Sequence, residues 1–353
     1  MDPSRRRLLM GLGTGVLAGF AGCTDVSLVD DDAEPLPVDE PEAGCPDGRT
    51  DAKDFFDERL IAVESDEYTD SVLTFSSVTP AAVLEDADLF AVDLRRPERL
   101  ADRIAVPMDE IDRVTHVTPP GDGVWPLYVV FETPVDREEW ERRFVTELQP
   151  PDPNQPFIVS PEARPDYRDY TRFHMPSLRV IDLVAYDDDH IVVGPAAEEP
   201  VESTSKDRVE RLLDLEAGEG RPHHCLYADV RELVTWIPVA NAIRCWFRTT
   251  DDPFPEDHRR GPAGARASAL TVDVRDASDD DATDEDRAVD ETQFDLAFTT
   301  VFRADEVDTA AVDAYVDRQW TETRGLGFED PSVDRDGRVV TVSETRLRSE
   351  MTR

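Results

Sequence analysis

The chain has little lysine, few cysteines and a small apolar fraction. Of its 38 basic residues only Lys53 and Lys206 are lysines, against 79 acidic residues, and the net charge is -41. Nucleic-acid binding proteins meet phosphates with a stripe of basic side chains, and this sequence has no such stripe, so we expect no nucleic-acid partner. Apolar residues make up 39% of the chain, which is low for a globular protein but too high for a wholly disordered one.

The acidic excess and the shortage of lysine resemble the surfaces of proteins from extreme halophiles. At molar salt the Debye length falls to about 3 Å, so repulsion between neighbouring carboxylates is screened. The carboxylates then keep the protein hydrated and soluble. We therefore interpret most of the negative charge as a solvated surface.

The sequence also lacks the short motifs of common enzymes. It contains no G-x-S-x-G elbow, no H-E-x-x-H pair and no P-loop lysine. Residues 13–18 fit G-x-G-x-x-A, but no predicted strand precedes them, so the dinucleotide interpretation fails. With six histidines and 79 acidic residues, a Ser-His-Asp set or a carboxylate pair stays open, because such sites are recognised by geometry. No cofactor is predicted.

Two groups of residues have the types that bind metals, but not the spacing. His223 and Cys225 could converge from one face of a strand, together with Cys245. Structural zinc sites usually show ligand pairs with two to five residues between the two ligands, and that pattern is absent. The acidic stretch 276–291 and the triplet 187–189 lack the glycine of a calcium-binding EF-hand loop. We predict no metal site and interpret both acidic stretches as solvated loops.

The first 23 residues have the pattern of an export signal. Arg5 and Arg6 open a charged segment, and an apolar run of 14 residues follows from Leu8 to Ala21. A helix that crosses a bilayer needs roughly 20 residues. A charged start, a short apolar run and small residues before a cleavage point define a secretory signal. Ala21-Gly22 stands directly before Cys23, as the small residues do in a lipobox.

These residues resemble the signals of prokaryotic lipoproteins, of the haloarchaeal type, that are exported by twin-arginine translocation. The resemblance covers residues 1–23 alone. It implies that the export machinery reads Arg5 and Arg6, that residues 1–22 are removed and that Cys23 carries lipid. Two lipid chains make a stable anchor, since one chain binds a membrane only reversibly. We expect an exported protein anchored to the outer face of the cell membrane.

If Cys23 is lipidated, the other three cysteines are Cys45, Cys225 and Cys245. An odd number in an exported chain leaves one thiol free or paired with another molecule. Cys225 and Cys245 both lie in the part that we expect to fold, while Cys45 falls among acidic residues and prolines. We expect a disulfide between Cys225 and Cys245, with Cα atoms within about 7 Å of each other.

Composition divides the remaining chain into a tether and two folded segments. Residues 23–50 are acidic and proline-rich and cannot bury a core, so we expect them to hold a domain away from the membrane. Residues 51–217 and 221–348 each show the order strand, helix, strand, strand, helix, strand, strand. This order predicts an α+β fold of two tandem ferredoxin-like (split βαβ) repeats with antiparallel sheets, each with one added strand.

The repeat hypothesis depends on matched local patterns. The matched pairs are strands at 89–94 and 226–230, helices after each, strand pairs at 114–132 and 269–302, helices along 140–148 and 307–315, and closing hairpins at 178–193 and 333–342. The second hairpin turns at Asp336-Gly337, a strong hairpin signal. The insertion 149–176 in the first segment is interpreted as a loop.

The sequence predicts a location but names no ligand. We expect a noncatalytic binding or scaffolding module at the cell surface, with another envelope protein as partner. One alternative is the solute-binding lipoprotein of a transporter, and a deep pocket between the repeats would favour it. A further alternative is an extracytoplasmic enzyme. A cleft that holds a buried group with a strongly shifted pKa would favour the enzyme.

Overall fold

The computed structural model describes about three fifths of the chain's length in thirteen stretches. They are residues 56–63, 72–83, 95–119, 126–148, 161–175, 181–196, 204–250, 252–255, 261–276, 292–303, 307, 309–322 and 328–351. All of them belong to one compact unit, Ala43–Arg353. The predicted signal, Cys23, the tether up to residue 50 and the strand expected at 89–94 lie outside the described residues.

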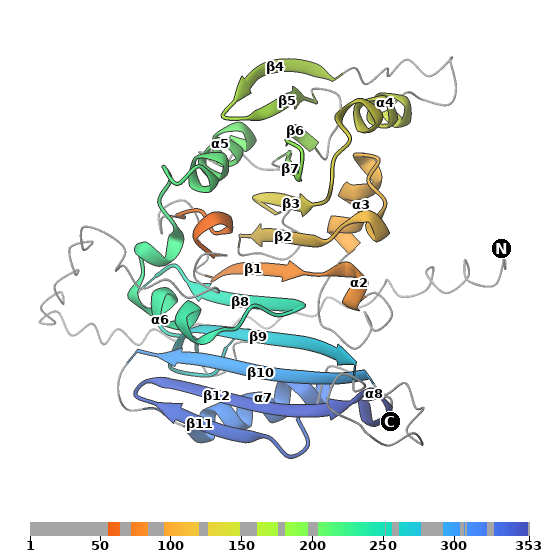
Figure 1. Ribbon diagram of the computed structural model, residues 1–353. Helices are drawn as coiled ribbons and strands as arrows, with labels where there is room; N and C mark the ends of the chain where they lie inside the picture. Colours follow the sequence, from red (N-terminus) through yellow and green to blue (C-terminus); the bar gives the residue numbers. More distant parts are fainter. Residues whose placement is uncertain are drawn as a thin grey trace, which may run out of the picture. The chain divides into compact units, whose positions relative to one another are not determined.

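The strands of the described residues form one sheet of twelve (Figure 1). Its order is β11-β12-β10-β9-β8-β1-β2-β3-β7-β6-β5-β4, and every neighbouring pair is antiparallel. The strands are β1 Val72–Val78, β2 Arg113–Thr118, β3 Tyr128–Glu132, β4 Glu162–Tyr167, β5 Tyr170–His174, β6 Ile181–Tyr186, β7 His190–Pro195, β8 Ala242–Arg248, β9 Ala265–Asp276, β10 Thr292–Phe302, β11 Ser332–Asp336 and β12 Val339–Leu347.

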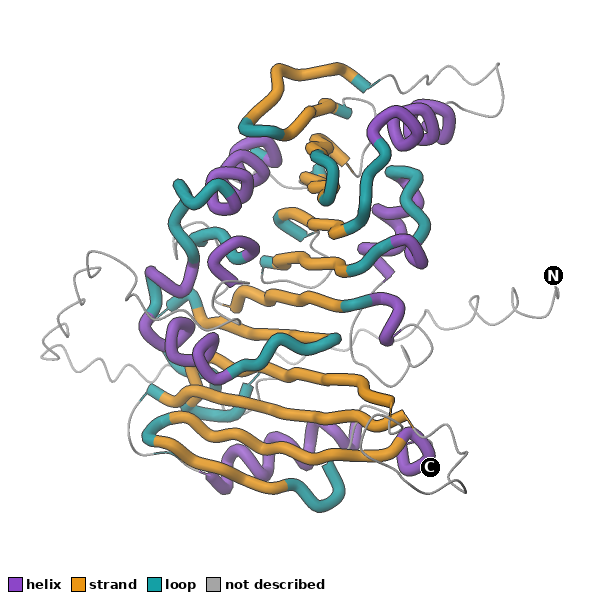
Figure 2. The backbone as a smooth tube through the Cα atoms, viewed as in Figure 1, coloured by secondary structure: helices purple, strands orange, loops and turns teal. Residues whose placement is uncertain are grey.

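Helices cover both faces of this sheet (Figure 2). They are α2 Pro80–Val83, α3 Arg95–Arg103, η4 Met108–Glu110, α4 Arg137–Leu148, α5 Ser205–Glu216, η5 His223–Cys225, α6 Ala228–Trp236, α7 Thr309–Glu322 and α8 Arg348–Met351. A short helical turn at 56–59 precedes α2. No helix among the described residues is both long and apolar enough to cross a membrane.

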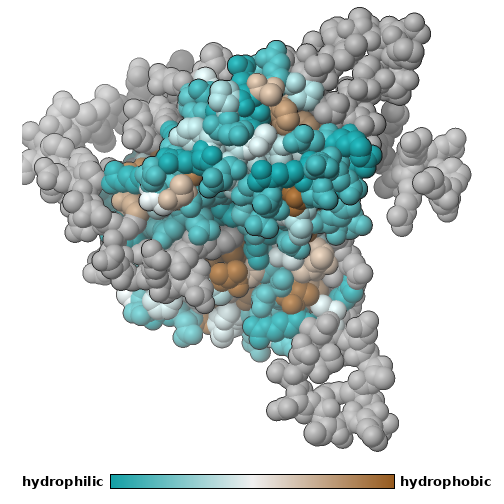
Figure 3. Space-filling model, turned by 45° about the horizontal axis from the view of Figure 1, so that its top comes forward, coloured by the Kyte–Doolittle hydropathy of each residue, from teal (hydrophilic) through white to brown (hydrophobic). Residues whose placement is uncertain are grey.

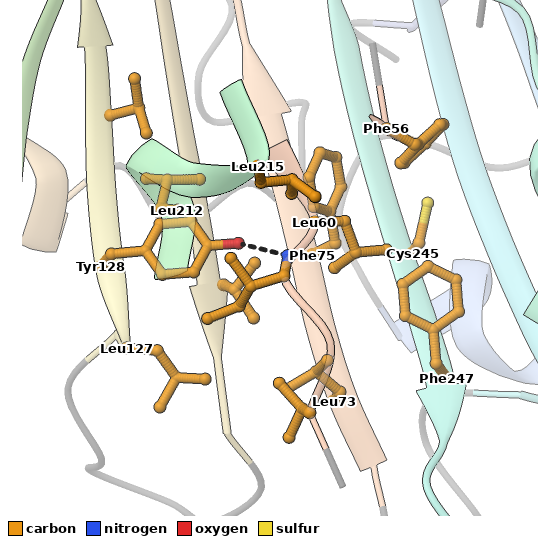
Figure 4. Packing of buried hydrophobic residues seen from close by; sticks show 14 of the residues in the cluster. Phe56, Leu60, Leu73, Phe75, Leu127, Tyr128, Leu212, Leu215, Cys245 and Phe247 are labelled. Atoms are coloured by element: carbon orange, nitrogen blue, oxygen red, sulfur yellow. Dashed lines mark hydrogen bonds between the residues drawn. The ribbon is translucent and has the colours of Figure 1, made fainter. Parts of the chain in front are cut away.

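The first face is the side of the sheet that α5, α6 and residues 56–63 cover. Because side chains alternate along a strand, Phe75, Val130 and Ala269 point to this face, and they share one buried cluster with Leu212 of α5. In the close-up, Tyr128 also points into this cluster, where its hydroxyl oxygen accepts a hydrogen bond from the backbone N–H of residue 61 at 3.4 Å (Figure 4). This cluster spans the middle of the sheet and joins its two ends.

The second face has two separate clusters. At one end α3 and α4 pack on the sheet, with Trp140 and Phe144 stacked at 4.8 Å. At the other end α7 packs Val312 and Tyr315 against Phe298 of β10. The spacing of Trp140 and Phe144 in the sequence predicted this buried stripe of α4.

The predicted fold class is wrong: the chain is not two tandem ferredoxin-like repeats. A split βαβ unit contains parallel strands joined through a helix. Here β1, β2 and β3 instead pair consecutively, as do β8, β9 and β10, and every pair is antiparallel. The segments predicted as separate repeats share one sheet, because β1 pairs with β8 along seven residues from Val72↔Arg248 to Val78↔Ala242.

Two local predictions are also wrong. Residues 226–230 form no strand, because helix α6 begins at Ala228 and buries Val230, Leu233 and Val234 at helical spacing. The insertion at 149–176, interpreted as a loop, contains the hairpin of β4 and β5. The hairpin at Asp336-Gly337 is confirmed, with Gly337 at φ 58°.

Candidate functional site

A groove of about 380 Å³ opens on the first face beside the end of α6. One wall is the segment 238–240, which follows α6 directly. The remaining lining comes from β9, β10, β11 and β12: Thr271, Asp273, Arg275, Asp295, Leu296, Ala297, Ser332, Ser343, Glu344 and Thr345. The antiparallel register places the first-face members of this set in rows, for example Asp273 opposite Asp295 and Asp295 opposite Thr345.

Among the described residues three large apolar side chains are exposed: Trp236 at 44%, Val239 at 45% and Val333 at 45%. Val239 lines the groove, and Trp236 lies two residues before the lining residue Pro238. Val333 stands opposite Val342, so its side chain lies on the other face of the sheet. Elsewhere the visible surface is mostly hydrophilic, with small separate apolar patches (Figure 3). Apolar exposure that gathers at a groove marks an interaction site more than the same exposure scattered singly.

The charges that line the groove are mainly negative. Three carboxylates, Asp273, Asp295 and Glu344, line it with one guanidinium, that of Arg275. Arg275 Nη2 lies 2.9 Å from Asp295, and Arg275 Nε lies 3.3 Å from Asp273. Two carboxylates therefore share one cation, and the groove retains a net negative charge.

A second arrangement with functional residue types is an ionic cluster centred on Arg59, at the opposite part of the first face. Residues Glu132 of β3 and His190 of β7 face each other across the strand pair. Arg59 Nε lies 3.3 Å from Glu132 Oε1, Nη1 lies 2.5 Å from Glu216 Oε1, and Nη2 lies 3.1 Å from His190 Nε2. Tyr170 donates to Glu216 Oε2 at 2.6 Å.

Burial and mutual contacts shift the pKa values in this Arg59 cluster. Burial raises the pKa of Glu216, although the nearby Arg59 opposes that shift. A hydrogen bond to Asp187 raises the pKa of His190. Burial alone would raise the pKa of Asp187, but hydrogen bonds from His190 and from the backbone N–H groups of residues 189 and 190 lower it to about 2. Burial and the charge of Glu216 raise the pKa of Tyr170.

The Arg59 cluster has a structural explanation. Its groups satisfy one another, and none of them lines the groove. Tyr128 donates to the backbone oxygen of Arg59 at 2.5 Å, so the cluster fastens residues 56–63 to the sheet and to α5. Shifted pKa values occur in structural ion-pair networks as well as in active sites. We assign the cluster to stability and take the groove as the candidate site.

The histidines predicted as weak metal candidates lie in η5, not on a strand. Val63 N–H donates to Nδ1 of His223 at 3.2 Å, and the fully buried Nε2 has no hydrogen-bond partner among the described residues. Burial, followed by the charge of His224, lowers the pKa of His223 to about 3. His224 Nε2 lies 2.6 Å from Asp57 Oδ1. Within the described stretches no group of three or more candidate ligands gathers at one point.

The predicted disulfide between Cys225 and Cys245 is wrong. Cys245 is a free, fully buried thiol of β8, next to Phe247 in the first-face cluster, and burial raises its pKa (Figure 4). Cys225 is disulfide-bonded, and its partner lies outside the described residues. The prediction paired these two cysteines only because both lie in the part expected to fold. Strand β8 instead directs the side chain of Cys245 into the first-face core.

The other predicted site residues fall in two groups. Arg5, Arg6, Cys23, Cys45 and residues 277–291 of the acidic stretch lie outside the described residues. Residues 187–189 are described, and there Asp187 accepts hydrogen bonds from the N–H groups of residues 189 and 190 at 2.9 and 2.6 Å. This carboxylate closes the turn between β6 and β7, in agreement with the loop interpretation.

Sequence reasoning missed both the groove and the Arg59 cluster. Arg59 is 73 positions from Glu132 and 157 from Glu216, and no local pattern links such distant residues. The groove likewise collects residues from four strands and one loop. One local signal of the groove was available: Trp236, a large apolar residue at the end of α6 that does not fall on the buried stripe of that helix.

Comparisons with known proteins add little. No model of a known protein family matches the chain, and no curated protein matches it. Among solved structures, one titled "Structure of crystal form I of TP0453" is similar, with a TM-score of 0.38 and 8% sequence identity. The match covers 79% of this chain and 94% of that chain. A similarity of this size supports no conclusion about function.

Proposed function

We propose that the protein is a noncatalytic binding module of the cell surface that takes another envelope protein in the groove beside α6. Lipid on Cys23 would hold it to the outer face of the membrane, and residues 24–50 would set the module off that surface. The location depends on Arg5, Arg6 and Cys23 in the export pattern.

The observation that supports binding is the coincidence of the groove with the exposed apolar side chains. Val239 lies in the groove, and Trp236 lies two residues before its lining residue Pro238. A polar rim around a small apolar centre is the usual anatomy of a protein interface. The many polar and charged residues of its lining suit a transient partner better than an obligate subunit, whose interface is more apolar.

Site-specific photo-crosslinking in intact cells tests this function. A photoreactive phenylalanine at position 239 should yield an adduct with one envelope protein. The same amino acid at Asp313, an exposed position of α7, should yield none. In Cys23→Ser, which should be released or left unprocessed, the adduct at position 239 should disappear. Equal labelling at positions 239 and 313, or none at either in a folded protein, would contradict the proposal.

A further inference from the structure

The two outer strands of the sheet differ in how their free edges are protected. β4 carries Pro165, and its register with β5 shifts between Arg164 and Tyr167. Proline and a bulge are two devices that keep another strand from pairing with an edge. β11, Ser332–Asp336, contains neither, and all five of its residues are exposed. Among the described strands, β11 is therefore the edge open to pairing.

The turn between β11 and β12 determines which backbone groups of β11 point outward. Asp336 and Val339 flank the two-residue turn and form the first hydrogen-bonded pair. Hydrogen-bonded and non-bonded pairs alternate along an antiparallel ladder. Asp334 and Ser332 therefore pair with β12, while Val333 and Arg335 direct their N–H and C=O groups away from the sheet.

The side chains of β11 differ between its two faces. On the first face Ser332, Asp334 and Asp336 continue the row of the groove, and two of these three are carboxylates. On the second face Val333 stands opposite the buried Val342 of the α7 cluster, and Arg335 stands opposite Val340. A strand added beside β11 would meet two acidic side chains on one face, and the apolar Val333 beside Arg335 on the other.

We propose that β11 accepts an extended segment of a partner protein as a thirteenth strand, with side chains that alternate between basic and apolar. The basic side chains lie beside Asp334 and Asp336, the carboxylates of β11 on the first face. The apolar side chains continue the α7 cluster beyond Val333. Main-chain hydrogen bonds supply affinity in such strand addition, and alternate side chains supply specificity. This inference rests on the proposed function and names the docking mode of its partner.

A second copy of this chain fits the same edge less well. Two β11 strands that pair in register about a twofold axis would place Asp334 opposite Asp334. Like charges directly opposite each other destabilise a strand pair. A basic partner strand replaces this repulsion by attraction, since each of its cations would lie beside a carboxylate.

Binding of labelled synthetic peptides to the folded chain tests the inference. The probe has about ten residues that alternate lysine and valine, which is the length of a long strand. Its control replaces each lysine by glutamate. The wild-type protein should bind the lysine peptide at least about tenfold more tightly by fluorescence anisotropy, and added salt should reduce that preference.

Protein variants at one position separate backbone pairing from charge. Val333→Pro removes an outward N–H without removing a bond to β12, so it should weaken binding by about tenfold. Val333→Thr keeps the N–H and should bind within about twofold of wild type. Circular dichroism serves as the control that both variants are folded.

Peptide variants give the same test without changing the protein. The lysine peptide with N-methyl groups on alternate residues, on the edge that faces β11, should lose binding. The peptide methylated on the other residues should keep it. Equal binding of the two methylated peptides would overturn strand addition. Equal binding of the lysine and glutamate peptides would overturn the basic partner, and a wild-type dimer that Val333→Pro dissociates would show that a second copy of this chain takes its place. If these tests fail while position 239 still crosslinks, the docking mode is wrong and the proposed function stands.

Discussion

The first half of the sheet, from β1 to α5, and the second half, from β8 to α8, follow one topology. Each begins with a three-strand meander, β1-β2-β3 or β8-β9-β10. Each continues with a helix on the second face, α4 or α7, and then a hairpin, β6-β7 or β11-β12. In both, the second strand of the hairpin pairs with the last strand of the meander.

The halves differ in what has been added to this plan. The first half inserts β4 and β5 beside β6, so its outer edge is the proline-bearing β4. It also ends in α5, which covers the first face over β3, β6 and β7. In the second half β11 is the outermost strand among the described residues, and the groove opens beside the end of α6. One strand topology therefore yields a closed half and an open half, depending on the elements added to it.

An ionic cluster also fastens a helix to the sheet in each half, α5 to the first and α6 to the second, but the two clusters differ in exposure. In the second half Asp229 and Glu232 of α6 pair with Arg338 of the β11–β12 turn, and Asp229 also pairs with Arg266. The Arg338 side chain is 23% exposed, against 7% for Arg59. A buried pair that loses one partner costs more than an exposed pair, because the remaining charge stays out of water.

Removing Arg59 should therefore have the largest effect. Arg59→Ala leaves Glu216 buried without its cation and should lower the free energy of unfolding by about 3–5 kcal/mol. Arg338→Ala should cost less, since water reaches its partners. Denaturant unfolding of both variants measures the difference, and Arg59→Met with Glu216→Gln should restore part of the loss. A greater loss from Arg338→Ala would show that the second cluster carries more of the stability.

The junction between the halves supplies the second test, through Cys225 in η5. Loss of its disulfide should lower the free energy of unfolding by about 2–4 kcal/mol. Cys225→Ser should therefore melt at a lower temperature than wild type, and a reductant should not lower its melting temperature further. Cys245→Val is the control, because it replaces a free buried thiol by a side chain of similar volume and should cost less than about 1.5 kcal/mol. A reductant that leaves the wild-type melting temperature unchanged would contradict this prediction.

The third test concerns acid sensitivity at the same junction. His223 is buried and neutral, with a pKa lowered from 6.5 to about 3. Below pH 6.5 the unfolded chain binds a proton that the folded chain does not, so stability falls as the pH falls. From about pH 7 to about pH 5 the loss should be about 2 kcal/mol.

His223→Phe separates this histidine from the carboxylates, which also titrate in acid. The variant should lose less stability than wild type over the same pH range, as measured by denaturant unfolding at each pH. Identical pH profiles would mean that His223 does not remain neutral in the folded protein.

Local pattern predicted the elements better than their arrangement. The hairpin at Asp336-Gly337 follows from turn chemistry. The helix stripe along 140–148 follows from the spacing of its apolar residues. The pairing of β1 with β8 could not be predicted in this way, since more than a hundred residues separate them. Both faces of β1 and β8 are mostly buried, so apolar residues stand on both sides of each strand and do not indicate which strand lies next to it.

The candidate site was harder to predict than the fold for the same reason. The groove becomes visible only when β9, β10 and β12 are aligned, because Asp273, Asp295 and Thr345 then form one row. In the sequence these are ordinary acidic and hydroxyl residues among many. The region around η5 was mispredicted for a different reason. His223 and Cys225 were interpreted as residues of a strand, but residues 223–225 form a short helical turn, and the helical stripe of Val230, Leu233 and Val234 begins just beyond it.

The smallest expected effect on stability comes from Pro165, and it tests the difference between the two edges directly. The residue lies in the irregular part of β4, where only its carbonyl oxygen is used, as an acceptor from Arg172 Nε at 2.8 Å. Pro165→Thr keeps that carbonyl and adds an N–H, so the free energy of unfolding should change by less than about 1 kcal/mol. If proline protects this edge, the variant should self-associate more than wild type as concentration rises, as measured by sedimentation velocity.

Asp166→Thr, at the neighbouring exposed position, keeps the proline and serves as the control for lost charge. If Asp166→Thr associates more than wild type and Pro165→Thr does not, charge rather than proline protects β4, and the structural contrast with β11 then rests on the bulge alone.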